Sequence, residues 1–179
     1  DAGDINLCIK AAMAEHKLEF DRIMDSLIEL TGKLRQSNMD PWVVITYGIP
    51  PALASLRNAE EFELAMKLIN LLVERQIDPG YHLQHGVPAI AHVASENEFR
   101  EAIRLSIKLV EHGFDPCEAM CYGIPALRAL NEHKFLSALK AGIKMAEQGI
   151  NPEMAFKIAL PPIAERRDFE KHMEVIFEF

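Results

Sequence analysis

The sequence predicts an all-α fold, an α-solenoid of about five antiparallel helix pairs with a repeat of 36–38 residues. Three observations predict it: a phrase that recurs four times, a helix stop followed at once by a helix start, and a common apolar stripe on the second helix of each pair. Each phrase opens with Asp-Pro or Asn-Pro and reaches Gly-x-Pro or a variant about ten residues later. The openings are Asp40-Pro41, Asp78-Pro79, Asp115-Pro116 and Asn151-Pro152, and the closings are Gly48-Ile49-Pro50, Gly86-Val87-Pro88, Gly123-Ile124-Pro125 and Ala159-Leu160-Pro161.

The chain is expected to form one repeat domain over residues 1–179. Two opening helices, over about 5–14 and 18–37, lack the Gly-x-Pro phrase and are interpreted as an N-terminal capping pair over 1–38, because terminal repeats are commonly atypical. The remaining boundaries are 39–77, 78–114 and 115–150 for full repeats and 151–179 for a C-terminal repeat.

Each junction between repeats carries local signals for ending one helix and starting the next. Asn38, Gly113 and Gly149 stand just past a helix end and suit the left-handed conformation, whereas Gln76 at the same position does not. The Asp or Asn two residues later is a good N-cap, and Pro suits the first helical position. Consecutive helices should therefore be antiparallel neighbours.

The second helices share apolar positions at spacings that fall on one helical face. This face should be the core of each repeat. Its residues are Phe62, Ala65, Met66, Ile69, Leu72 and Val73, then Phe99, Ala102, Ile103, Ser106, Leu109 and Val110, then Phe135, Ala138, Leu139, Gly142, Met145 and Ala146.

The proline inside each first helix should interrupt it, because the ring crowds the carbonyl four residues back and removes a hydrogen bond at a cost of about 3 kcal/mol. We expect a kink or break there, with the nearby Gly allowing close backbone approach. The alternative is that carbonyls freed near Thr46, Gln84 and Cys121 face a ligand.

Composition narrows the function classes. The net charge of −8 argues against binding nucleic acid through phosphate neutralisation. No apolar run reaches the roughly 18–20 residues of a membrane helix, so no membrane partner is expected. The three cysteines, Cys8, Cys117 and Cys121, have no disulfide-rich spacing, which favours a reducing, cytoplasmic location.

The junction Glu147-Gln148-Gly149-Ile150-Asn151-Pro152 resembles that of pentatricopeptide repeats. The resemblance covers most of residues 38–179. It implies paired-helix units that bind single-stranded RNA along their inner helices, although the Gly-x-Pro phrase is not part of that family's pattern. Single-stranded RNA binding is therefore an alternative function for the chain.

The positions that vary within the phrase are candidate contacts for a partner. Tyr47, His85 and Tyr122 occupy the residue before Gly in successive repeats, and His82, Trp42 and Tyr81 are further candidates. Stacked repeats would turn these into a polar-tipped aromatic strip for a peptide or helix. The alternative is that the rings are buried and their polar tips satisfy carbonyls that the proline has opened.

Two pairs of metal-ligand residue types lie on helical faces, His82 with His85 and Cys117 with Cys121. They make zinc or copper binding a further alternative, although such residues on repeat helices more often pack in the core. We expect no metal, cofactor or catalytic residue, since no phosphate loop, nucleophile elbow or His-Glu-x-x-His motif is present. The chain is not expected to be an enzyme.

The last helix carries Met173, Ile176 and Phe179 on its stripe, with no capping helix after it. An uncovered apolar stripe is an association surface, so a homo-oligomer through this helix is one expectation. The function predicted from these observations is a protein-protein interaction module or assembly scaffold. Its partner would be a protein or peptide that meets the first-helix face of the repeats.

Overall fold

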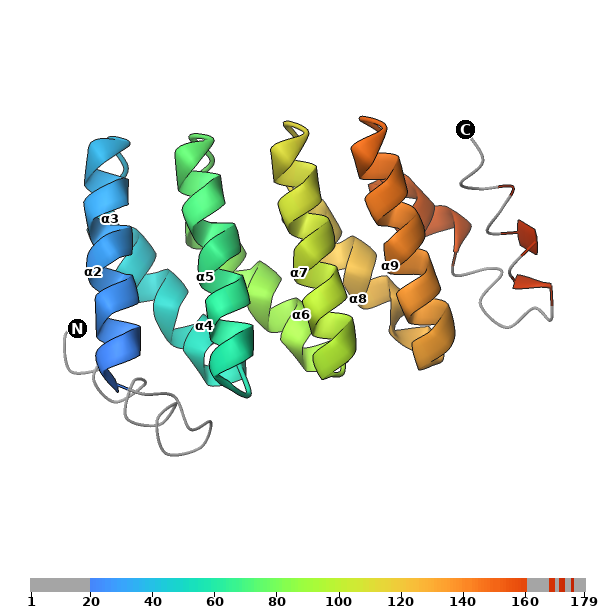
Figure 1. Ribbon diagram of the computed structural model, residues 1–179, viewed down its shortest axis with the longest axis horizontal. Helices are drawn as coiled ribbons and strands as arrows, with labels where there is room; N and C mark the ends of the chain where they lie inside the picture. The colour runs from blue at the N-terminus through green and yellow to red at the C-terminus, as the bar shows by residue number, and fades with distance from the viewer. Residues whose placement is uncertain (1–19, 161–167, 170, 173–174, 176–179) are drawn as a thin grey trace. The chain divides into compact units, whose positions relative to one another are not determined.

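The computed structural model describes residues 20–160 together with 168, 169, 171, 172 and 175. The helix expected over 5–14 and the association residues Met173, Ile176 and Phe179 lie outside the described residues. Every element within them is helical and none is a strand, which confirms the all-α prediction (Figure 1).

The chain divides into two compact units, residues 1–92 and residues 93–179, here called unit 1 and unit 2. The single domain expected over residues 1–179 stays a prediction.

Over residues 20–92, the part that the structure describes, unit 1 contains two long helices and two interrupted ones. Helices α2 (Phe20–Gln36) and α5 (Ala59–Glu74) pack against each other, and so do the interrupted segments that follow them (Figure 1). The first interrupted segment runs through α3 (Pro41–Val43), η1 (Val44–Gly48) and α4 (Ile49–Ser55), and the second through η2 (His82–Gly86) and α6 (Val87–Val93).

Unit 2 repeats this pattern. The long helices α7 (Glu96–Glu111) and α9 (Glu132–Glu147) pack against each other. The interrupted segment η3 (Ala119–Gly123), α8 (Ile124–Ala126) and η4 (Leu127–Ala129) follows α7, and η5 (Ala155–Ala159) follows α9 and packs on η3 and α8. Below, α2, α5, α7 and α9 are called the second helices and the interrupted segments the first-helix segments.

The tight junctions form as the residue types predict. The apolar residue after each junction donates its N–H to a carbonyl five residues back; Met39 bonds Leu34 and Ile77 bonds Leu72, both at 2.9 Å, which is the bond that defines a Schellman stop. The positive φ expected at Asn38, Gly113 and Gly149 is present, and Gln76 also adopts it, at φ 61°. The expectation that Gln76 would not fit is therefore wrong, because the surrounding hydrogen bonds hold it there despite its Cβ.

The next helix start follows within two residues. The side-chain oxygen of each predicted N-cap accepts a hydrogen bond from the backbone N–H two residues on, as from Asp40 to Trp42 at 2.9 Å and from Asn151 to Glu153 at 3.0 Å. A stop and a start so close together make the two helices antiparallel neighbours.

The core is the stripe predicted on the second helices. Phe62, Phe99 and Phe135 are each at most 2% exposed, and every other stripe residue of α5, α7 and α9 is buried. Close crossings are visible at two glycines. A Cβ on Gly48 would lie 2.9 Å from the Leu83 Cβ, and one on Gly142 would lie 2.5 Å from the Phe156 ring.

The interruption expected at the internal prolines takes a specific form, a five-residue π-helical segment that ends at the Gly of each phrase or at its Ala replacement. The residue before the proline donates to the carbonyl five residues back, as from Val87 to His82 and from Ile124 to Ala119. Because the wider turn gives the proline ring room, the helix continues past it.

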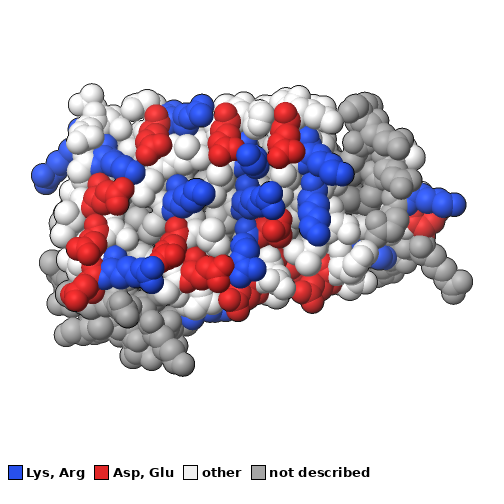
Figure 2. All heavy atoms as spheres, in the orientation of Figure 1, with Lys and Arg blue, Asp and Glu red and all other residues white. Residues whose placement is uncertain are grey.

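The exposed sides of the second helices carry interspersed charges of both signs, along α2 and α5 in unit 1 and along α7 and α9 in unit 2 (Figure 2). Some of them join neighbouring helices. Arg22 of α2 pairs with Glu63 of α5, and the Lys33 Nζ lies 3.3 Å from Glu74 Oε1. Within the described residues, no helix is long and apolar enough to cross a membrane.

Candidate binding surface on the first-helix segments

The first-helix segments of unit 1 expose an aromatic, uncharged face. Residues 41–56 and 79–95 contain no Asp, Glu, Lys or Arg. Trp42 is 60% exposed, Tyr47 59% and Tyr81 46%, and His85 is exposed as well. The alternative that Tyr47 and His85 are buried rings does not hold in unit 1.

Local structure fixes these side chains on the surface. The cap bond from the Trp42 N–H to Asp40 sets the first turn of α3. Tyr47 and His85 each lie in a π-helical segment, directly before the glycine that ends it. The Tyr81 and His85 rings pair with their centroids 4.5 Å apart and their planes tilted by 51°. Such tilted contacts hold aromatic rings in place without burying them.

A groove of about 820 Å³ lies beside this face, between α4 and the η2–α6 segment. Most of its lining is alanine and proline, and its polar groups are an amide, a hydroxyl and two imidazoles. The lining residues are Pro51, Ala54, Ser55, Gln84, His85, Pro88, Ala89, Ala91 and His92. Apolar walls with a few polar groups are typical of surfaces that receive a ligand or a peptide.

A second hollow of about 330 Å³ lies next to Trp42, where the start of α3 meets α2. Arg35 and Asp40 contribute its charged groups, and Thr31 contributes a hydroxyl. Trp42 therefore borders one hollow and His85 borders the groove.

His82 differs from the other candidates. It is only 2% exposed, and its Nδ1 lies 3.1 Å from the carbonyl oxygen of Asp78, one turn earlier. The imidazole is thus buried and contributes nothing to the exposed face. Because His82 is buried while the ring of His85 is exposed beside Tyr81, the two histidines do not form a shared donor pair.

Unit 2 presents a different first-helix face. Tyr122 is 51% exposed, but the Lys157 Nζ lies 5.4 Å from the centre of its ring. Lys157 also lies 3.3 Å from Glu118 and 3.4 Å from Glu153, and the hydrogen bond to Glu118 raises the pKa of Lys157. The tyrosine predicted as a contact is thus on the surface, but among charges.

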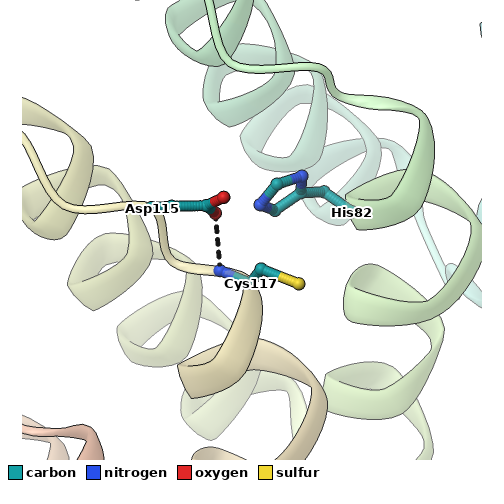
Figure 3. Close-up of side chains that lie close together, drawn as sticks. All are labelled: His82, Asp115 and Cys117. Carbon is teal, nitrogen blue, oxygen red and sulfur yellow. Dashed lines mark hydrogen bonds between the residues drawn. The ribbon is translucent and has the colours of Figure 1, made fainter.

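Unit 2 also holds two thiols with a carboxylate near them. Cys117 and Cys121 are free cysteines, each partly buried, and burial raises the pKa of both thiols, that of Cys121 to about 12. The Cys117 backbone N–H donates to Asp115 Oδ1 at 2.9 Å (Figure 3). An oxygen of the Asp115 carboxylate lies within 4.8 Å of the Cys117 sulfur.

Comparisons with family models, with curated proteins and with solved structures found no match to this chain. Function is therefore inferred from the residues themselves.

Two parts of these surfaces were not predicted from the sequence. The groove residues other than His85 were missed, and their available signal was the absence of charge in 41–56 and 79–95. Asp115 was interpreted as an N-cap alone, although its position two residues before Cys117 was a signal for a combined oxygen and sulfur donor set.

Proposed function

We propose that the chain is a protein-protein interaction module that binds a peptide segment of a partner protein on its first-helix face. The observation that carries the proposal is the exposure of Trp42, Tyr47, Tyr81 and His85 on segments without formal charge. The centres of protein interfaces are enriched in Trp and Tyr and depleted of charge, since burying an unpaired charge is costly.

The groove beside this face supports an extended, uncharged peptide as the bound form. Alanine and proline walls leave room for alternate side chains of a strand-like or polyproline segment, whose backbone carbonyls have no partners of their own. The Gln84 amide and the His85 and His92 rings line the groove and can donate to such carbonyls.

The same proposal includes an α-solenoid as the architecture that presents this face. It is supported by the recurrence, inside each unit, of long helix on long helix and interrupted segment on interrupted segment. Small-angle scattering of the full chain tests it, because a stack of hairpins and a compact globule of equal mass have different radii of gyration.

The binding role is tested with defined peptides. A displayed library of random twelve-residue peptides is selected on the wild-type chain, and the enriched peptides are synthesised and titrated by fluorescence anisotropy. The double variant Tyr47→Ala/Tyr81→Ala should weaken binding by about ten-fold or more, as truncating anchor residues does. Ile28→Ala, which removes an exposed apolar side chain from α2, is the matched control and should leave affinity unchanged.

Two outcomes would contradict the proposal: no peptide enriched above the background of an unrelated protein, or unchanged affinity in the double variant. Circular dichroism and a thermal melt of each variant separate lost binding from lost folding.

Single-stranded RNA binding, which the resemblance to pentatricopeptide repeats implies, is tested in parallel. The unit 1 first-helix segments offer no Lys or Arg to neutralise phosphate. We expect no mobility shift with mixed-sequence single-stranded RNA at low salt, and a salt-sensitive shift would favour the RNA alternative.

We also propose a reducing compartment, the cytosol, as the location of the chain, with no catalytic activity of its own. The free thiols of Cys117 and Cys121 support the location. Fractionation of cells that carry a tagged chain tests it. Self-association through Met173, Ile176 and Phe179 is tested by sedimentation of a triple Ser variant, which should be smaller than the wild type if these residues join two copies.

A further inference from the structure

We propose that Cys117 and Cys121, together with the carboxylate of Asp115, form a binding site in unit 2 for a thiophilic d¹⁰ metal ion of the zinc class. The inference concerns residues outside the proposed peptide-binding face of unit 1 and does not depend on it.

The backbone places the two sulfurs together. Cys121 lies in η3 and Cys117 four residues before it, so the two side chains fall on the same side of the helix. Zinc binds sulfur at about 2.3 Å, so two tetrahedral ligands stand about 3.8 Å apart, a separation within reach of such a pair.

Asp115 adds an oxygen donor from the turn before the helix. Its carboxylate is held by the N–H of Cys117 at 2.9 Å and reaches to within 4.8 Å of the Cys117 sulfur (Figure 3). Rotation of the Cys121 side chain toward this pair would bring a second sulfur to the same ion. Two thiolates and a carboxylate are a donor set that zinc accepts, with a remaining position for water or another ligand.

The surroundings of the two cysteines are negatively charged. The carboxylates of Asp115, Glu118 and Glu153 lie close enough to act on the Cys117 thiol. A bound cation would be attracted by these carboxylates and would offset the repulsion between them and two thiolates.

The equivalent position of the fourth repeat shows how the proposed metal ligand can be removed while the helix cap is kept. Asn151 occupies the position of Asp115 and makes the same cap bond, at 3.0 Å to Glu153. Asp115→Asn therefore keeps the helix start while it removes a charged oxygen donor. Asp78→Asn makes the same change at the equivalent position of unit 1, where no cysteine follows, and is the matched control.

The test uses the full chain with Cys8→Ser, purified without a histidine tag under reducing conditions. Titration with Co²⁺ should produce a thiolate-to-cobalt charge-transfer band that saturates at one ion per chain and disappears on adding Zn²⁺. Cys117→Ser and Cys121→Ser should each abolish the band, and Asp115→Asn should weaken Co²⁺ binding by about ten-fold. Asp78→Asn should bind Co²⁺ with the same affinity as the Cys8→Ser chain.

Alkylation gives a second measurement that needs no further variant. Zn²⁺ should protect both cysteines from iodoacetamide, read by mass spectrometry of the modified peptides. Lack of a charge-transfer band in the parent protein, a band that survives both serine substitutions, or alkylation that proceeds equally with Zn²⁺ present would each overturn the site.

Discussion

The second helices and the first-helix segments differ in backbone geometry and in the chemistry of their exposed sides. The second helices are regular α-helices that start at Asn58, Ser95 and Asn131 caps, and their outer faces carry both charges. The first-helix segments pass through a π-helical turn before each proline. In unit 1 their exposed side chains carry no formal charge and include the rings of Trp42, Tyr47 and Tyr81.

From this difference we infer that, in unit 1, the second helices stabilise the fold and the first-helix segments contact a partner. Charged outer faces with ion pairs such as Lys33 to Glu74 are ordinary solvated surfaces and add little to stability. The buried stripe beneath them carries most of it. An exposed row of aromatic rings adds little to folding, so we infer that its contribution is to recognition. Four sets of substitutions test this inference, from the largest expected effect to the smallest.

Phe99→Ala should have the largest effect, because it empties a fully buried position on the stripe of α7. We expect the free energy of unfolding to fall by about 3–5 kcal/mol. Urea denaturation followed by circular dichroism measures it. A loss below about 1 kcal/mol would show that the second helices do not hold the core as inferred.

Gly142→Ala probes the contact between the two kinds of helix, since its Cβ would lie 2.5 Å from the Phe156 ring and 3.3 Å from Leu105. Overpacking of this kind costs about 1–3 kcal/mol. Gly32→Ala is the matched control, because nothing lies within 4 Å of a Cβ added there, and it should stabilise α2 by up to about 1 kcal/mol. Equal melting temperatures for the two variants would contradict the close crossing.

Gln76→Gly should stabilise the chain, because Gln76 is held at φ 61° at the end of α5. Relief of the Cβ strain, less the added freedom of glycine in the unfolded chain, is expected to give about 0.5–1 kcal/mol. Asn38→Gly at the equivalent position should gain less, since Asn tolerates this conformation. Thermal melts of both variants provide the comparison, and a destabilised Gln76→Gly would refute it.

Tyr47→Ala should have the smallest effect on folding, within about 0.5 kcal/mol, because its side chain is largely exposed. The same substitution should weaken peptide binding, so stability and affinity separate at this residue. If Tyr47→Ala lowers the free energy of unfolding by more than about 1 kcal/mol, Tyr47 belongs to the core, and the inference that its side chain serves recognition is wrong.

The parts of the fold that were predictable depend on local chemistry. The caps at Asp40, Asp78, Asp115 and Asn151 and the buried stripe follow from side-chain type and helical spacing, and they appear where expected. The π-helical segments were not predicted, because proline indicates that a helix is disturbed without specifying which hydrogen-bond pattern absorbs the disturbance.

The candidate surface was predictable only in part. Trp42, Tyr47, Tyr81, His85 and Tyr122 are exposed as a partner contact requires, but His82, three residues from His85, is buried. That distinction depends on which side of η2 is packed in the folded chain, which residue type alone does not specify. The groove depends on the pairing of α4 with the η2–α6 segment, which repeat spacing alone does not specify.

The tight turns that join one hairpin to the next have a consequence for how such a chain changes in evolution. A residue inserted between Leu72 and Asp78 would break the paired stop and start, so variation in turn length is poorly tolerated there. Duplication or deletion of an entire hairpin leaves every turn intact. Divergence in the size of related chains should therefore preserve these turns and occur as whole repeats or elsewhere within a hairpin, as the repeat spacing of 36–38 residues in this chain already does.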